Sequence, residues 1–387
     1  MRMNVGIYIQ VPFCQTKCTY CNFHTGVFAQ SLYDPYASAV CRELAEHAAL
    51  CGDADVALEA NFAVDTVYIG GGTPSLLAPA TMARILDAVR ASFRCQFEEV
   101  TLEADPETVT PEKAAAWRAA GINRVSLGVQ SFRDAELVAA GRMHRSADIS
   151  AATRALRDAG IANIGFDLIA GLPHQTAESW EDSLRQLFGL RPAHASIYLL
   201  EIDEGSRLGR EALAGGFRYS AARLPSDDAM AGFYEAARTL LAQHAYEHYE
   251  ISNWALPGFR SRHNVKYWRR EPYLGFGAGA HSFDGRERWA NVHDPAAYVA
   301  AIDTGRSPVE QRQRVTPAQA LEEELFLGLR QLEGIEMDRI EKQYNASLRP
   351  RLERLREAGL VEFEGTRLRL AASRLTVANE VFVELLG

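Results

Sequence analysis

The chain has 387 residues, of which 47% are hydrophobic and 24% are charged, and this composition excludes a largely disordered protein. It carries 41 Lys and Arg residues against 50 Asp and Glu residues, a formal net charge of −9, so we expect no nucleic-acid partner. The longest apolar stretches fall short of the roughly 18 residues that a membrane-spanning helix needs. Gln10 and Pro12 come too early for a signal-peptide core. These features predict a cytoplasmic protein.

Short β-rich runs alternate with amphipathic helical segments over the first half of the chain. Such alternation predicts βα units around a parallel sheet. Six units are enough for a partial (β/α)6 TIM-like barrel and too few for a closed eight-stranded one. We expect an α/β fold with this barrel in residues 1–225, and a functional site at the carboxyl ends of its strands. The predicted strands are 5–11, 66–70, 99–104, 124–129, 163–169 and 195–200, and the predicted helices are 36–50, 80–93, 111–121, 146–160 and 176–190.

Two further units are expected after the barrel. Residues 226–315 are predicted to form a linking region, which is dense in aromatic residues and His. Residues 316–387 have the pattern of helices followed by a hairpin (360–371) and a short last helix. This outline predicts a small helical or winged-helix-like C-terminal domain. Folds of this kind host many roles, and we expect a packing role rather than DNA binding.

Three of the six cysteines are clustered in the sequence CQTKCTYC (14–21). Thiolates at such spacing bind iron–sulfur clusters or zinc. Three of them predict a [4Fe–4S] cluster on Cys14, Cys18 and Cys21, with one iron left open for a substrate or cofactor. Zinc would need a fourth ligand, and the spacing of His24 is unlike that of paired zinc motifs; chance clustering is the other alternative. We expect small buried side chains or inert thiols at the scattered positions, Cys41, Cys51 and Cys95.

The cysteine triplet resembles the hallmark of the radical S-adenosylmethionine (SAM) superfamily. It directly follows the first predicted strand, and YIQVPFC (8–14) leads into it. The second strand runs into GGGTPS (70–75), which is similar to the superfamily's glycine-rich segment beside the methionine end of SAM. Glycines there let backbone amides approach a ligand closely. The resemblance implies a [4Fe–4S] cluster whose open iron is chelated by SAM.

The chain is similar, from Tyr8 into the C-terminal domain, to the coproporphyrinogen oxidase-like branch of that superfamily. The branch has a set of SAM contacts in which carboxylates accept the ribose hydroxyls and an Arg pairs with the methionine carboxylate. A structural cap or salt bridge is the alternative role for the two matched carboxylates. The chain departs from the oxidases at Glu201 and His281, where they have small or apolar contacts. The matching positions are Tyr8, Tyr20, Gly71, Gly72, Thr73, Glu103, Gln130, Arg142 and Asp167.

Within this branch the chain resembles the HemW-type haem chaperones. The oxygen-independent coproporphyrinogen III oxidases have a further Cys two residues after the triplet, where this chain has Asn22-Phe23. HNVKYW (263–268), followed by YLGFGAGAHSF (273–283), matches the HNxxYW motif of the HemW-type group. The resemblance implies binding of haem b and its transfer to acceptor proteins, which we expect to be respiratory and membrane-associated. The alternative is an enzyme of the same branch, a radical methyltransferase or, less favoured, a coproporphyrinogen III oxidase, so enzymatic activity stays open.

His263 is the candidate axial ligand of the haem iron. Neutral imidazole is a standard axial ligand, and Tyr267 and Trp268 could stack on a flat macrocycle. The alternative is a His packed in an aromatic loop with its ring nitrogens satisfied by hydrogen bonds, and His281 and His24 compete as ligands. If haem binds here, the segment should lie within reach of the barrel mouth, at the end where the cysteines are.

Overall fold

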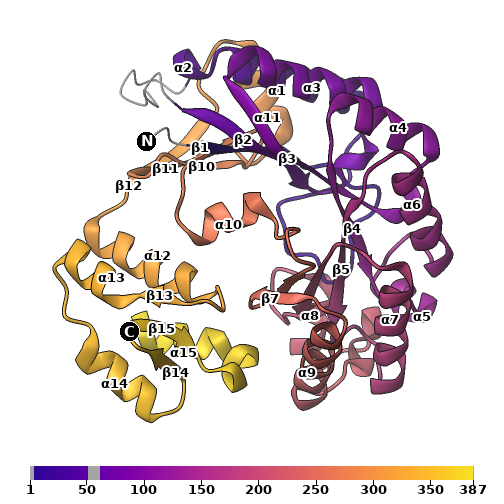
Figure 1. Ribbon diagram of the computed structural model, residues 1–387. Coiled ribbons are helices and arrows are strands. Elements are labelled where there is room, and N and C mark those ends of the chain that lie inside the picture. Colours follow the sequence, from indigo (N-terminus) through magenta and orange to yellow (C-terminus); the bar gives the residue numbers. More distant parts are fainter. Residues whose placement is uncertain (1–3, 51–61, 387) are drawn as a thin grey trace.

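The computed structural model describes residues 4–50 and 62–386, so the prediction for Cys51 lies outside the described residues. Six strands hydrogen-bond in parallel and in chain order, and helices cover their outer side (Figure 1). The partial (β/α)6 barrel is therefore confirmed. Its strands are β1 (Asn4–Val11), β2 (Ala63–Gly71), β3 (Cys95–Ala104), β4 (Arg124–Gln130), β5 (Asn163–Ala170) and β6 (His194–Leu199). Its helices are α1 (Tyr33–Ala45), α2 (His47–Leu50), α3 (Pro79–Ser92), α4 (Pro111–Ala120), α5 (Asp134–Ala139), α6 (Ser146–Asp158) and α7 (Ala177–Leu190).

The barrel strands alternate apolar and polar side chains, and successive side chains of a strand face opposite sides of a sheet. In β3, Val100 and Leu102 belong to the same buried apolar cluster as Trp117 of α4. Thr101 and Glu103 point to the other side, where Thr101 accepts a hydrogen bond from Arg124 of β4. Hydrophobic burial thus holds the helices to the outer face of the sheet. The inner face stays polar and is suited to a polar ligand.

The predicted linking region supplies further strands to the barrel sheet. At one edge β9 pairs in parallel with β1, and three antiparallel strands follow it in the order β10, β11, β12. At the other edge β8 pairs antiparallel with β6 and carries β7. Strands this short show too few alternations to be predicted from sequence. They are β7 (Glu247–Glu250), β8 (Asn253–Ala255), β9 (Tyr273–Phe276), β10 (His281–Phe283), β11 (Glu287–Asn291) and β12 (Val309–Arg314). The region also holds α9 (Asp227–Gln243) and α11 (Pro295–Asp303), while α8 (Arg207–Leu213) precedes it, after β6.

Helix α10 (Arg262–Trp268) closes the amino-terminal end of the barrel and lies inside the arc of strands in Figure 1. Glu99, in the first half of β3, accepts hydrogen bonds from the backbone N–H groups of Arg262 at 3.0 Å and His263 at 3.1 Å. A carboxylate at a helix N-terminus is stabilising. The ring of His263 also bonds to Thr66, in the first half of β2. The expectation that this segment lies near the barrel mouth is wrong, because these contacts hold it at the opposite end.

The small helical and winged C-terminal domain is confirmed. Its three strands form an antiparallel sheet in the order β13-β15-β14, flanked by helices (Figure 1). Arg330 joins this domain to the barrel, because its guanidinium pairs at 2.7 Å with the buried carboxylate of Glu250. The elements are α12 (Pro317–Leu329), β13 (Ile335–Glu336), α13 (Met337–Tyr344), α14 (Arg349–Glu357), β14 (Val361–Glu364), β15 (Arg367–Leu370) and α15 (Ala378–Leu386).

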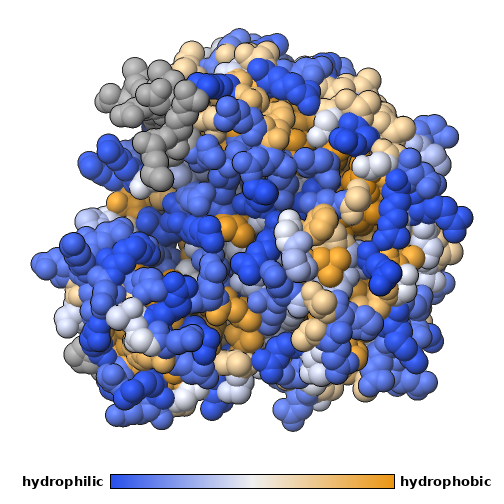
Figure 2. Space-filling view, in the orientation of Figure 1, coloured by the Kyte–Doolittle hydropathy of each residue, from blue (hydrophilic) through white to orange (hydrophobic). Residues whose placement is uncertain are grey.

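The surface is mostly polar on the face shown in Figure 2, where apolar side chains form small separate patches. Two large apolar side chains are well exposed in the loop after β1, Phe23 at 67% and Val27 at 62%. Among residues 4–50 and 62–386, no helix has the length and apolar character needed to cross a lipid bilayer.

The buried carboxylate of Glu43 in α1 joins the barrel to the sheet extension. It accepts hydrogen bonds from the Gly277 backbone N–H at 2.9 Å, the Asn291 side-chain amide at 2.6 Å and the Tyr298 hydroxyl at 2.5 Å. Burial raises the pKa of Glu43 to about 7, although these hydrogen bonds oppose the shift. The three donors belong to the segment after β9, to β11 and to α11. One side chain therefore fixes the position of three elements.

Replacing Glu43 by Ala should lower the free energy of unfolding by at least about 2 kcal/mol, because three buried donors lose their acceptor. Urea unfolding followed by circular dichroism measures the change. Glu43→Gln keeps one acceptor oxygen and should lose less. Equal unfolding midpoints for wild type and Glu43→Ala would show that the network does not stabilise the fold.

Candidate functional site

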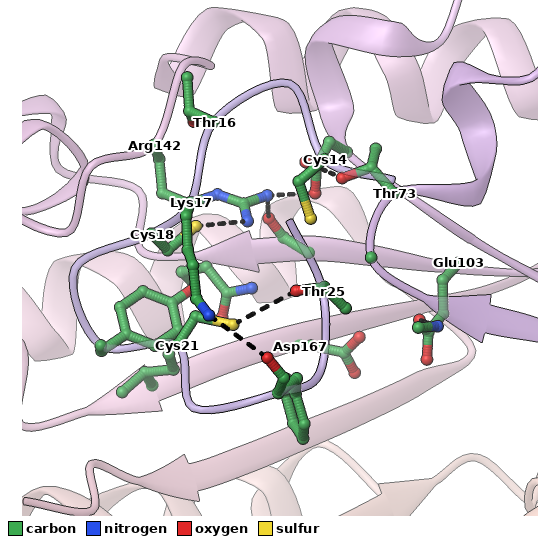
Figure 3. A pocket seen from close by; sticks show the side chains of 18 of the residues that line it. Cys14, Thr16, Lys17, Cys18, Cys21, Thr25, Thr73, Glu103, Arg142 and Asp167 are labelled. Atoms are coloured by element: carbon green, nitrogen blue, oxygen red, sulfur yellow. Dashed lines mark hydrogen bonds and ion pairs between the residues drawn. The ribbon is translucent and has the colours of Figure 1, made fainter. Parts of the chain in front are cut away.

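A cavity of about 480 Å³ opens at the carboxyl ends of the barrel strands (Figure 3). We call this end the barrel mouth. Every site residue predicted from the sequence lines the cavity, except Tyr8 and His263. Those that line it are Cys14, Cys18, Tyr20, Cys21, Gly71, Gly72, Thr73, Glu103, Gln130, Arg142 and Asp167.

Residues 14–25, which we call the cysteine loop, leave β1 and return to it. The loop is closed at its base, because the Cys14 N–H donates to the Gly26 carbonyl at 2.8 Å and the Gly26 N–H donates to the Pro12 carbonyl at 3.0 Å. Its far side is held by Thr19, whose N–H donates to the carbonyl of Ala140, after α5, at 3.0 Å. These backbone bonds hold all three thiols at one wall of the cavity, as Figure 3 shows.

The thiol of Cys14 lies in an environment that disfavours its ionisation. Burial raises the pKa of Cys14, and the neighbouring Cys21, Asp105 and Cys18 raise it further, while a hydrogen bond from Thr25 opposes the shift. A bound iron–sulfur cluster would favour ionisation instead, because a thiol must lose its proton to ligate a metal. In the described part of the chain, no three His, Cys, Asp or Glu side chains gather closely enough to hold a single metal ion.

The glycine-rich segment after β2 packs directly on the cysteine loop. The Gly72 N–H donates to the Val11 carbonyl at 2.8 Å, and the Thr73 N–H donates to the Phe13 carbonyl at 2.7 Å. A Cβ atom on Gly72 would lie 2.5 Å from the Phe13 carbonyl oxygen and 2.9 Å from the Cys14 sulfur. Gly71 has φ +116°, a conformation that favours glycine. Side chains at these positions would push the segment away from the cysteines.

Arg142 links the cysteine loop to the ends of two strands. Its side chain is 8% exposed and forms an ion pair with Asp105, the residue after β3. The same guanidinium donates to the Gly128 carbonyl at 2.9 Å and to the Cys18 sulfur at 3.5 Å (Figure 3). Thr73 donates to the second oxygen of Asp105 at 3.1 Å. One connected set of polar contacts therefore joins the cysteine loop, the glycine-rich segment and the carboxyl ends of β3 and β4.

Glu103 is connected to Tyr8 through Tyr68. The Tyr8 ring stacks on Tyr68, with centroids 6.0 Å apart, and the Tyr68 hydroxyl donates to Glu103 at 2.7 Å. The Gly71 N–H donates to the other oxygen of Glu103 at 2.9 Å. Burial raises the pKa of Glu103 to about 7, and the charges of Asp167 and Asp105 add to the shift. Tyr8 itself does not line the cavity, and its hydroxyl donates to Gln10 at 2.7 Å.

Asp167 and Gln130 complete the wall on the side of β4 and β5. Burial raises the pKa of Asp167, and hydrogen bonds from Ser196 and Ser126 oppose the shift, the latter at 3.0 Å. Gln130 has φ +60°, an unfavourable conformation for a residue other than glycine. It occurs where the pairing of β4 with β5 shifts register at the mouth. A strained backbone at a cavity wall is typical of functional sites.

The comparisons with known proteins agree with this geometry. Residues 8–187 match the model of the Radical SAM superfamily, and residues 315–372 match the model of the HemN C-terminal domain. A protein named heme chaperone HemW from Bacillus subtilis is 33% identical over 98% of both chains. The HemW of Mycobacterium tuberculosis is 36% identical over 99% of this chain and 95% of its own. The chain belongs to the HemW family of radical SAM proteins.

Coproporphyrinogen III oxidase (HemN) of Escherichia coli, described as a radical SAM enzyme, has the same fold as this HemW-family chain. The two structures superpose with a TM-score of 0.82 over 99% of this chain and 90% of that one, at 23% sequence identity. Identity this low shows the fold alone. Membership in the radical SAM superfamily implies a [4Fe–4S] cluster and SAM, and the residues present fit both. Three thiols share one wall of the cavity, and half-buried carboxyl groups and glycine backbone line other parts of it.

In this HemW-family chain His263 is fully buried at the floor of the barrel. Its Nδ1 atom lies 2.9 Å from the Thr66 hydroxyl, and its Nε2 atom lies 2.9 Å from the Tyr267 hydroxyl. Burial lowers the pKa of His263 to about 3, helped by the charges of Lys266 and Arg124, so the ring is neutral. Both ring nitrogens already have partners. Haem ligation by His263 therefore requires this ring to give up a hydrogen bond.

Sequence reasoning missed Asp105, which pairs with Arg142. Its position directly after β3 was the available signal, since polar residues at strand ends face the mouth of such folds. It also missed Lys17 and Glu107, both of which line the cavity. The scattered Cys41 and Cys95 are half-buried, and burial raises the pKa of both thiols, as expected for inert groups.

If Glu103 accepts the ribose hydroxyls, as the resemblance predicts, SAM should bind about tenfold more tightly as the pH rises from about 6 to 8, because burial raises the pKa of Glu103 to about 7 and its ionised form is the better acceptor. Equilibrium binding of SAM to the cluster-loaded protein measures this. Glu103→Gln should abolish the dependence. Glu107→Gln is the matched control, because Glu107 also lines the cavity with a pKa of about 7. An unchanged pH dependence in Glu103→Gln would exclude Glu103 as the titrating group.

Proposed function

We propose that this protein is a haem chaperone, which binds haem b and passes it to acceptor proteins. The observation that carries the proposal is the match to proteins named heme chaperone HemW, at 33% and 36% identity over nearly the whole chain. Position 23 supports it, because an exposed Phe stands where the oxidases have their further Cys. We further propose respiratory, membrane-associated proteins as the acceptors and the cytoplasm as the location.

Cys14, Cys18 and Cys21 are the proposed ligands of the [4Fe–4S] cluster. They come from one loop whose ends are closed by backbone hydrogen bonds, so their relative positions are set before the cluster binds. Arg142 donates to the Cys18 sulfur, and hydrogen bonds to a ligating sulfur tune its charge. Three protein ligands leave one iron for SAM, as in the family that the chain belongs to.

The remaining cavity residues are the proposed SAM site. Glu103 and Asp167 would accept the ribose hydroxyls, and the methionine end would lie along the backbone of Gly71 and Gly72, which lines the cavity beside the cysteine loop. Arg142 is the cation placed to attract the methionine carboxylate, although Asp105 already neutralises part of its charge. The proposed site is completed by Tyr20, Thr73 and Gln130, which also line the cavity. Tyr8 lies behind it and packs against the ring of Tyr68.

A bound and reduced cluster would be the source of an electron for the SAM sulfonium. The chain's own part is to hold SAM beside the cysteine loop and to keep water from it. Ile169 and Leu200 also line the cavity, and both side chains are at least nine-tenths buried. Apolar walls of this kind strengthen the polar contacts inside a site by excluding water.

Axial ligation of haem by His263 stays a prediction. Ligation there would have to open the floor of the barrel, because α10 is held by Glu99 and Thr66.

Cys18→Ala should fail to retain a four-iron cluster after anaerobic reconstitution, because only two thiolates remain in the loop. Iron and sulfide analysis measures the loss. The matched control is Cys41→Ala, which removes a half-buried thiol outside the loop and should keep the wild-type content. Equal iron and sulfide in Cys18→Ala and wild type would make the cluster assignment wrong.

Purified protein given haem should develop a Soret band and should not oxidise coproporphyrinogen III in the presence of SAM and a reductant. Haem binding and coproporphyrinogen oxidation, measured on the same protein, distinguish a chaperone from an oxidase of the same branch. Oxidation of coproporphyrinogen, or the absence of saturable haem binding, would contradict the proposed function.

A further inference from the structure

Three histidines far apart in the sequence meet at the barrel mouth beside the cysteine loop. β9 is parallel to β1, so its carboxyl end lies at the mouth, and the antiparallel β10 begins there with His281. β11 runs antiparallel to β10 and ends at the mouth, two residues before His293. His24 belongs to the cysteine loop itself. Strand directions alone therefore bring the three imidazoles to one edge.

Two of the three rings are in contact, and one of these two has a buried nitrogen without a partner. The His24 and His293 rings have centroids 4.4 Å apart, at an interplanar angle of 36°. The Nδ1 atom of His293 is buried and has no hydrogen-bond partner in the described residues. Gly279 makes room for it, because a Cβ atom there would lie 2.9 Å from that nitrogen. His24 and His281 are exposed, in contrast to the enclosed His263.

Apolar and cationic groups flank His24 in the cysteine loop and directly after it. Phe23 and Val27 are 67% and 62% exposed, a high value for large apolar side chains. Lys17 reaches over the loop, and its ammonium group donates to the Phe23 carbonyl at 3.5 Å (Figure 3). Each of these groups suits one part of haem. An imidazole can ligate the iron, an exposed aromatic ring can pack on the flat macrocycle, and an ammonium group can pair with a carboxylate.

We propose that haem docks on the segment from Phe23 to Val27, with the imidazole of His24 or His281 as the axial ligand of its iron. The macrocycle covers Phe23 and Val27, a haem propionate pairs with Lys17, and His293 positions His24 by packing its ring against it. This inference rests on the proposed function and gives the haem a place next to the cysteine loop. Haem can reach this surface without any movement of α10.

Haem titration of the cluster-loaded protein, followed at the Soret band, tests the location. The double variant His24→Ala/His281→Ala should bind haem at least tenfold more weakly, with a shifted Soret maximum and unchanged iron and sulfide of the cluster. Phe23→Ser should weaken binding with the Soret maximum unmoved. His244→Ala, which removes an exposed histidine at the end of α9, is the matched control and should bind as wild type does.

Wild-type affinity and spectrum in the double variant would overturn the inference, and loss of the spectrum in His263→Ala alone would place the haem at the barrel floor instead. Failure of wild type itself to bind haem would refute the proposed function rather than the location. A second measurement does not depend on the folding of any variant. Iron-free protoporphyrin IX should bind wild type at least tenfold more weakly than haem does, and equal affinities would exclude an axial ligand.

Discussion

The ion pair between Arg142 and Asp105 lies where the separate walls of the cavity meet. Asp105 follows β3, while the guanidinium of Arg142 also reaches the Gly128 carbonyl in β4 and the Cys18 sulfur after β1. A largely buried cation is stable only while its acceptors stay in place, since losing one leaves an uncompensated charge. The orientation of the cysteine loop is therefore coupled to the carboxyl ends of β3 and β4, which are distant from it in the sequence. Thr73 joins the glycine-rich segment to the same pair.

A polar barrel interior connects this mouth to the floor. Glu103 is bonded to Tyr68, whose ring lies 5.3 Å from the ring of His263, and His263 is bonded to Thr66. The HNVKYW segment thus has a structural role that its sequence does not reveal. It fills the amino-terminal end of an open barrel with a helix whose N–H groups are capped by Glu99. The haem-binding surface that we infer lies at the other end, where His24 and His281 are accessible.

Local patterns were enough to predict the barrel and the cysteine ligands, and the resemblance to a known family predicted most of the other cavity residues. Strand β4 and its neighbours are apolar on alternate positions, and the cysteine triplet and glycine-rich segment each lie within one short stretch, so both could be found in the sequence. The location of α10 could not, because it depends on contacts between His263 and residues such as Thr66, which is 197 positions away. The meeting of His24, His281 and His293 was missed for the same reason. It follows from strands of three to five residues, which carry too little pattern to be predicted.

The central claim is that the mouth cavity holds an iron–sulfur cluster with three protein ligands and SAM beside it. Electron paramagnetic resonance of the reduced, cluster-loaded protein, recorded before and after addition of SAM, tests it most directly. The account predicts that SAM changes the spectrum of the cluster, because the iron without a cysteine ligand is free to bind it. A spectrum of a four-iron cluster that is identical with and without saturating SAM would contradict the account.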